Sequence, residues 1–367
     1  MKRIILIPVL CIIMLAVLAL PVRAVSVQEE QANALNTDEL ENALSDEAED
    51  ILGDMSVMDS IDIDSGIKKL IDGILDKTGG IFKRGLKSAA IMLAIAILCS
   101  IANAIYDGKH QNYVVLAAVL AVSAVAVSDV GSFIGLGISA LDDLDTFSKI
   151  LLATLTTAAA AGGAITSAAA KYAATVLFLN IIITAARNVI VPLIYAYIAA
   201  SIGSAALGGE GLNGAANLIK WVTGAVITVI MLAFVTYLTL TGIISGTTDA
   251  MVAKVAKTAI STVLPVVGGI IADATDTVLA GASILRNVIG IFGMLAVAAI
   301  CVIPFIKLGI HYLLYKVSSG LAAAISDSRI SKLLSSLGTA FGMMMGVVGA
   351  SALMVFLSVI SVIKVVA

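Results

Sequence analysis

Residues 287–310 read NVIGIFGMLAVAAICVIPFIKLGI, and this stretch decides the class of fold. It carries one charged side chain, Lys307, and as a helix it is long enough to cross about 30 Å of hydrocarbon. Inside a membrane, backbone polar groups are satisfied only in helices or closed barrels. Barrel strands alternate polar and apolar residues, whereas this stretch is continuously apolar. It therefore predicts a membrane-spanning helix.

Much of the remaining chain has the same character. Hydrophobic residues make up 60% of the sequence, charged residues 13%, and the mean hydropathy is +1.09. Soluble proteins contain roughly 45–50% apolar and about 25% charged residues, so this composition argues against a soluble enzyme or a disordered chain. Six further candidate spans are residues 88–106, 113–140, 150–170, 173–205, 221–247 and 334–363. We expect an all-α, polytopic membrane domain over residues 88–367, with seven or eight membrane-spanning helices.

The first residues resemble an export signal. Lys2 and Arg3 precede an apolar run over residues 4–20, and a short Pro21-Val22-Arg23-Ala24 segment follows. This order is typical of a secretory signal peptide, here residues 1–24. The alternative is an uncleaved first membrane helix. In both cases the segment that follows is exported.

The next segment, residues 25–87, is strongly acidic as far as residue 80. Within it, apolar residues at 67, 70, 71, 74 and 75 follow helical spacing, and Gly79-Gly80 is the expected end of that helix. Such a helix lies on the membrane surface, docks a partner, or packs against its own membrane domain.

Residues 263–285 are ambiguous. Pro265, Gly268 and Gly269 predict a helix break, so this stretch is an eighth span, a broken helix or a re-entrant hairpin. An eighth span places Lys307 and Arg329 on the cytoplasmic side, which fits the excess of basic residues in cytoplasmic loops better. The choice between seven and eight spans stays open.

Charged side chains inside or beside apolar runs are the candidate functional residues. Each costs roughly 2.5–3.5 kcal/mol at the centre of a membrane helix, so such residues pair, face the bundle interior or line a wet path. The candidates for a polar pathway or intramembrane pairing are Asp129, Arg187, Asp273, Asp276 and Arg286. The alternative is a segment near the membrane surface, where water reaches the carboxylates.

Small residues mark a candidate packing face. Gly338, Gly342, Gly346 and Ala350 recur every four residues and share one side of a helix. In lipid, small residues allow close backbone approach between helices. The face serves packing within the chain, self-association or docking on another membrane protein.

Signals for catalysis are missing from the sequence. It contains no phosphate-binding loop, no zinc-protease motif and no recognisable Ser/His/Asp set. His110 and His311 each stand beside a polar break, and Cys99 and Cys301 lie in apolar runs. We expect no catalytic residue, no metal and no cofactor. A dense basic face is also absent, so nucleic-acid binding is not expected.

One region resembles a known family. The resemblance lies in residues 240–249 (LTGIISGTTD), Lys254 and Lys257, residues 264–269 (LPVVGG), Ala272-Asp273 and Thr277-Val278-Leu279. These residues are similar to those of the stage III sporulation protein AE family. The layout also agrees along the chain, with a signal sequence, an acidic exported segment and a polytopic body.

The resemblance implies a non-enzymatic, multi-pass subunit of the channel complex between mother cell and forespore in endospore-forming bacteria. The subunit would lie in the mother-cell membrane surrounding the forespore and support late forespore gene expression and forespore integrity. Implied partners are other stage III sporulation membrane proteins, a cytoplasmic ATPase and a forespore-side channel partner, besides the lipid bilayer. A permease-like core is one role for such a subunit. The rival interpretations are a stand-alone secondary transporter and a purely structural membrane scaffold.

Overall fold

The computed structural model describes residues 37–53, 55–105, 111–162, 165–208, 210–263 and 268–363, with only the backbone described for residues 59, 61, 165, 210, 242–263 and 268–280. Its elements are α3 (Thr37–Glu41), α4 (Asp46–Leu52), the 3-10 helix η1 (Met58–Ile61), α5 (Ile63–Ile105), α6 (Gln111–Ala161), α7 (Ile165–Ala185), the π-helix η3 (Ala186–Ile190), α8 (Val191–Leu207), α9 (Glu210–Val263), α10 (Gly268–Ile325) and α11 (Ser328–Ile363). Every element in this part of the chain is helical, which confirms the all-α prediction.

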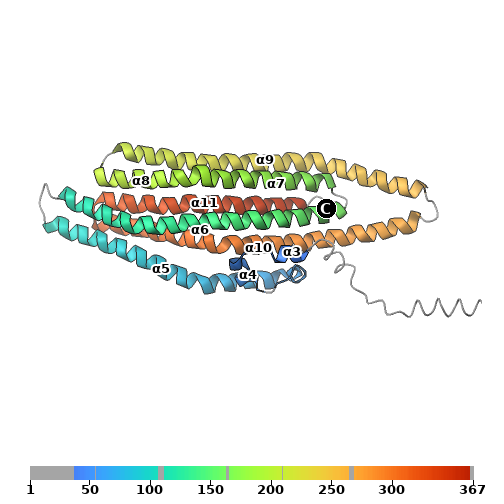
Figure 1. Ribbon diagram of the computed structural model, residues 1–367, viewed down its shortest axis with the longest axis horizontal. Coiled ribbons are helices and arrows are strands. Elements are labelled where there is room, and N and C mark those ends of the chain that lie inside the picture. Colours follow the sequence, from blue (N-terminus) through green and yellow to red (C-terminus); the bar gives the residue numbers. More distant parts are fainter. Residues whose placement is uncertain are drawn as a thin grey trace, which may run out of the picture.

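The long helices form an elongated bundle in which α5, α6, the continuous α7–η3–α8 stretch, α9, α10 and α11 alternate in direction (Figure 1). Helices α5, α8 and α10 end at one end of the bundle, where α6, α9 and α11 begin. The acidic N-terminal helices and the last turn of α11 lie toward the other end. Within the described residues, six helical stretches are long and apolar enough to cross a membrane, with α7, η3 and α8 counted together.

The predicted break between spans 113–140 and 150–170 is wrong. Helix α6 continues without interruption from Gln111 to Ala161, and the next helix begins at Ile165. Asp142, Asp143 and Asp145 lower the local hydropathy without ending the helix, because they stand on its exposed or half-buried side. The expected span 150–170 is therefore divided, with residues 150–161 in α6 and residues 165–170 in α7, which accounts for six membrane-competent helices in place of seven.

The predicted helix end at Gly79-Gly80 is also wrong. Helix α5 runs from Ile63 to Ile105, so the amphipathic helix and the first expected span are continuous. The expected boundary at residues 87 and 88 falls inside this helix. Its apolar stripe faces outward, with Ile67, Ile71 and Leu75 exposed. Leu70 of the same stripe packs against the core, so among the described residues the stripe is covered only in part.

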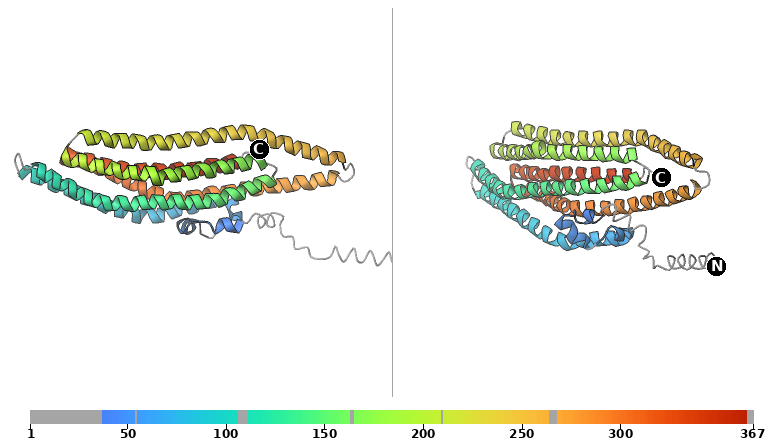
Figure 2. Two further views of the ribbon diagram at one scale, coloured as in Figure 1. Left: turned by 45° about the horizontal axis from the view of Figure 1, so that its top comes forward. Right: turned by 45° about the vertical axis from the view of Figure 1, so that its right-hand side comes forward.

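The ambiguous stretch after residue 263 is described in part. Helix α9 ends at Val263 and α10 begins at Gly268, with Gly269 as its second residue. Pro265 lies outside the described residues, so the break expected there stays a prediction. From Gly268 onward the backbone is one helix to Ile325, and the far parts of α9 and α10 extend beyond the other helices (Figure 2).

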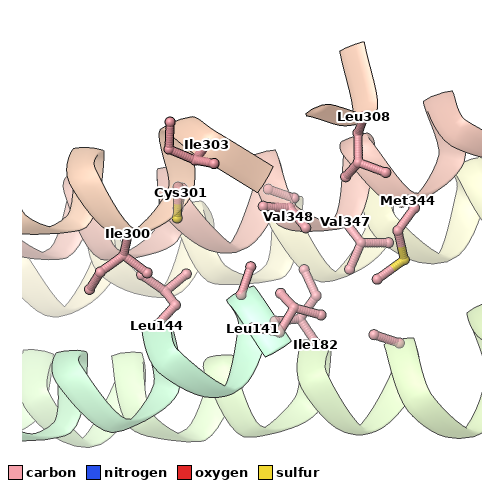
Figure 3. Close-up of a cluster of buried hydrophobic side chains, with 14 of the residues drawn as sticks. Leu141, Leu144, Ile182, Ile300, Cys301, Ile303, Leu308, Met344, Val347 and Val348 are labelled. Carbon is pink, nitrogen blue, oxygen red and sulfur yellow. The ribbon is translucent and has the colours of Figure 1, made fainter. Parts of the chain in front are cut away.

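The core of the bundle lies between α6, α10 and α11, with α7 closing one side (Figure 3). Leu141, Leu144, Ile182, Ile300, Val347 and Val348 are among its buried side chains. Small residues bring these helices close together. A Cβ added at Gly293 of α10 would lie 2.6 Å from Leu151 Cδ2 of α6, which is closer than two carbons approach. The apolar sequence thus produces a tightly packed interior.

The acidic N-terminal helices dock on this bundle. Leu40 of α3 and Leu52 of α4 are fully buried, and the Ser60 hydroxyl donates a 3.2 Å hydrogen bond to the Val288 carbonyl of α10. Lys69 Nζ of α5 donates to the Leu52 carbonyl at 3.1 Å. The start of the described chain is therefore part of the folded body, positioned beside α5 and α10 (Figure 1).

Candidate functional site

A polar face runs along the middle of α6. We call it the α6 polar face, and it consists of Asp129, Ser132, Gly135, Ser139 and Asp143. Steps of three or four residues place these positions on one side of a helix. From Tyr113 to Val127 of α6, the exposed side chains are instead apolar or aromatic, as Leu120 and Val127 show. The character of the helix surface therefore changes from apolar to polar near Asp129.

A cavity of about 470 Å³ opens where the α6 polar face meets α5 and α10. We call it the boundary cavity. Its polar lining consists of Arg84, Ser88, Asp129, Ser132, Lys307 and His311. Its apolar lining consists of Ile81, Phe133 and Leu136. The cavity brings two cationic groups, a carboxylate, an imidazole and two hydroxyl groups together from three helices.

Asp129 is fixed by a buried tyrosine. The hydroxyl of Tyr315 on α10 donates a 2.9 Å hydrogen bond to Asp129 Oδ2, and the Tyr315 side chain is fully buried. A buried tyrosine hydroxyl needs such a partner, and the carboxylate supplies it. This bond ties α10 to α6 at one wall of the boundary cavity.

His311 is held in one orientation at the same wall. Its Nδ1 lies 2.8 Å from the Lys307 carbonyl oxygen, which only accepts, so Nδ1 carries the hydrogen. In the neutral ring, Nε2 is then an acceptor. The ring packs 4.0 Å from Phe133, centroid to centroid, and a Cβ added at Gly85 of α5 would lie 3.3 Å from Nε2. The lone pair of Nε2 therefore points toward the α5 side of the cavity.

A second cavity of about 430 Å³ lies beyond the first along α6. We call it the α4 cavity. Its lining residues are Ser45, Asp46, Glu47, Gly135, Leu136, Ser139, Ala140, Asp143 and Pro304. Leu136 lines both cavities, so they are neighbours. Glu47 Oε1 accepts from Lys307 Nζ at 3.1 Å, which links the acidic α4 to the wall of the boundary cavity.

The structure does not gather the sequence-predicted charges at one place. Asp129 lines the boundary cavity, whereas Arg187 of η3 pairs with Asp142, about 20 Å farther along α6 at 1.5 Å per residue. Arg286 is buried in α10, and its Nε and Nη1 have no hydrogen-bond partner within the described part of the chain. Asp273 and Asp276 lie on the α10 backbone, and their side chains are outside the described residues. A pathway built from all five residues stays a prediction.

Sequence reasoning missed four residues at this site, namely Arg84, Lys307, His311 and Tyr315. For three of them, the spacing along the sequence was a signal that could have been used. Lys307, His311 and Tyr315 follow one another by four residues and so share a face of α10. This pattern was concealed because the carboxylate beside these residues, Asp129, is far away in sequence on α6.

The predicted glycine face contacts helices of the same chain. A Cβ at Gly338 would lie 3.3 Å from Tyr315 Cβ and 3.4 Å from the Tyr312 carbonyl oxygen. Gly342 also faces Tyr312, with 3.1 Å from its built Cβ to Tyr312 Cδ2. Gly346 is exposed and meets only Ile227 of α9, at 3.9 Å, while Ala350 is buried. The first half of this face thus packs against α10 inside the molecule.

Comparison with known proteins gives a clear family relation. A family model described as stage III sporulation protein AE matches residues 49–366. The stage III sporulation protein AE of Bacillus subtilis (strain 168) is 30% identical over 139 residues, which are 38% of this chain and 34% of that relative. The alignment therefore spans about a third of the relative's length. No solved structure shows significant similarity.

Proposed function

This chain belongs to the stage III sporulation protein AE family, and from this premise we propose that it is a subunit of the channel-like complex linking mother cell and forespore. The observation that carries the proposal is the family match over residues 49–366, which include all six membrane-competent helices. We place the protein in the mother-cell membrane surrounding the forespore. There it supports late forespore gene expression, through sigma factor activation, and forespore integrity.

The proposed partners follow from the same premise. Other stage III sporulation proteins are the expected neighbours in the membrane, with a cytoplasmic ATPase and a forespore-side channel partner completing the complex. The exposed apolar stripe of α5, at Ile67, Ile71 and Leu75, supports contact with a partner or a membrane surface outside the chain's own core. The protein itself acts without catalysis in this proposal.

A deletion strain tests the proposal directly. Loss of the gene should stop development after engulfment and abolish a late forespore reporter, while vegetative growth stays normal. Expression of the intact gene should restore heat-resistant spores. A normal spore yield from the deletion strain, or a general growth defect, contradicts the proposal.

Within the complex, we propose a permease-like role for the α5–α6–α10 side of the bundle. The supporting observation is that the boundary cavity and the α4 cavity follow one another along α6 and share Leu136. Charged and hydroxyl-bearing side chains line both cavities, as the water-filled entrance of a path through a membrane protein requires. The rival, a structural scaffold, is supported by the packed interior between α6, α10 and α11.

Blocking the two cavities separates these roles. Leu136→Trp places a bulky ring where the cavities meet, whereas Leu120→Trp on the same helix adds it to a side chain that is already exposed. A permease-like role predicts that Leu136→Trp alone lowers late forespore gene expression while co-purification with partners persists. A scaffold predicts equal, near-normal sporulation for both variants. Asp273→Asn with Asp276→Asn is the corresponding test of the sequence-predicted pathway.

A further inference from the structure

The boundary cavity lies where an uncharged surface ends. Helix α5 carries no charged residue from Ser88 to Ile105, and α6 carries none from Gln111 to Ser128. Each stretch measures roughly 26 Å at 1.5 Å per residue, close to the ~30 Å of a bilayer's hydrocarbon. Asp129 is the first charged residue beyond the α6 stretch, and it lines the cavity. On α5 and α6, the cavity therefore lies at the level expected for lipid headgroups.

The surface of the uncharged α5 and α6 stretches, next to the cavity, is suited to acyl chains. Along the uncharged stretch of α5, the side chains of Ile91, Leu98 and Ile101 are exposed, and Val127 is exposed on α6. Just before this stretch, α5 carries three basic residues, Lys83, Arg84 and Lys87. Basic residues at the end of an apolar surface are typical of sites that bind phospholipid headgroups.

One side of the cavity offers donors to a phosphate group. The Arg84 guanidinium has one recorded hydrogen bond, a long 3.4 Å contact from Nε to the Gly80 carbonyl of its own helix. No carboxylate in the described residues lies within ion-pair distance of it. Ser88, one turn further along α5, adds a hydroxyl. Arginine with a neighbouring hydroxyl is well matched to phosphate oxygens.

The other side offers acceptors to an ammonium group. Asp129 presents a carboxylate, of which one oxygen is used by Tyr315, and His311 presents the lone pair of Nε2. His311 is only 5% exposed, so this acceptor is reached chiefly through the cavity. At Asp129 a wholly anionic ligand would be repelled, whereas an amine would be held, and the neighbouring Lys307 ammonium is already paired with Glu47.

We propose that the boundary cavity binds a phosphoethanolamine group, the phosphate at Arg84 and Ser88 and the ammonium at Asp129 and His311. The cavity of about 470 Å³ is within the usual size of small-molecule sites, roughly 300–1,000 Å³. Because the apolar surfaces of α5 and α6 continue directly from it, the source of the group is a phospholipid, phosphatidylethanolamine, with its chains against Ile91 and Leu98.

Lipid retention tests this proposal. The full chain, purified in detergent, is incubated with equal amounts of phosphatidylethanolamine, phosphatidylglycerol and phosphatidylcholine of the same acyl chains, and bound lipid is counted by native mass spectrometry. Phosphatidylethanolamine should be retained in preference to the other two. Arg84→Gln should lower its retention by roughly tenfold or more, because a charge-assisted hydrogen bond is lost. Lys83→Gln, which removes a neighbouring exposed charge that does not line the cavity, should leave retention unchanged.

A second variant tests the ammonium side independently of folding. Asp129→Asn keeps an oxygen for the Tyr315 hydroxyl but removes the charge. In this variant, phosphatidylethanolamine and phosphatidylglycerol should be retained nearly equally. If Asp129 had only a structural role, the ratio of the two retained lipids would stay as in the native chain. Equal retention of all three lipids by the native chain would overturn the proposal, as would undiminished retention by Arg84→Gln. Displacement of bound lipid by an equal concentration of free phosphoethanolamine would assign the cavity to a soluble ligand and overturn the lipid assignment.

Discussion

Replacing Gly338 by leucine should destabilise the isolated protein, without any partner present. A Cβ at this position already lies 3.3 Å from Tyr315 Cβ and 3.4 Å from the Tyr312 carbonyl oxygen. Tyr315 is fully buried, and the carbonyl belongs to the backbone of α10. Neither atom can move aside easily, so the three further carbons of leucine would have to push α10 and α11 apart.

The expected cost follows from overpacking. Adding carbon to a well-packed interior costs typically about 1–3 kcal/mol and sometimes more. The same change at Gly131 of α6 is the matched control, since a Cβ there meets nothing within 4 Å. Both substitutions replace glycine in a helix and gain similar helix propensity, up to about 1 kcal/mol, so that contribution cancels in the comparison.

The measurement is the free energy of unfolding of the purified chain, obtained by titrating detergent-solubilised protein with a denaturing detergent. Gly338→Leu should be less stable than Gly131→Leu by about 1–3 kcal/mol or more. Gly346→Leu should be affected much less, because Gly346 is exposed and its nearest side-chain atom is 3.9 Å away. Equal stability of Gly338→Leu and Gly131→Leu, together with loss of partner co-purification, would mean that this face packs against another molecule, and our reasoning would be refuted.

Three further predictions concern other parts of the molecule. Cys99 and Cys301 are buried and free, so neither should react with a maleimide in the folded protein, and both should react after unfolding. Lys316→Met should lower stability by about 1–2 kcal/mol, because Lys316 Nζ donates three 2.9 Å hydrogen bonds to Ser335 and Thr339, and such bonds average about 0.6 kcal/mol in membranes. In a cysteine-free background expressed in vegetative cells, a water-soluble thiol reagent added to intact cells should label Leu75→Cys but not Leu207→Cys. Both residues are exposed, Leu75 lies in the first half of α5 and Leu207 ends α8, and the start of α5 and the end of α8 lie toward opposite ends of the bundle (Figure 1).

Controls make these outcomes decisive. Lys332→Met removes an exposed lysine near the start of α11 and should leave stability within about 0.5 kcal/mol of the native value. A similar loss from Lys332→Met would show that charge removal, not the hydrogen bonds, explains the Lys316 effect. Labelling of Leu207→Cys in intact cells would contradict an exported N-terminal segment combined with alternating helices. With Cys11 replaced by serine, rapid maleimide reaction of the folded protein would contradict the burial of both Cys99 and Cys301.

The sequence was a good guide to the class of fold because hydropathy depends mainly on local composition. The apolar run at residues 287–310 lies within α10, and residues 334–363 lie within α11. Helix boundaries were predicted less well. A hydropathy window averages over all sides of a helix, so the acidic residues at 142–145 resembled a loop although they occupy the outer side of a continuous helix.

The candidate site depended on contacts between distant segments. Asp129 was recognised from its apolar surroundings, but its partner Tyr315 is on another helix. Lys307 appeared only as a charge within a span, and its pairing with Glu47 requires the N-terminal helices to fold back onto α10. Such pairs are set by how helices pack, which residue spacing in one helix cannot reveal.

The length of α10 has a consequence for where partners can meet this protein. With 58 residues, α10 extends over roughly 87 Å at 1.5 Å per residue, almost three times the hydrocarbon thickness of a bilayer. The bilayer cannot enclose such a rod unless it lies steeply inclined. Whichever part of an upright α10 the bilayer encloses, more than half of its length lies outside the hydrocarbon, where partner proteins can bind it without displacing fatty acyl chains.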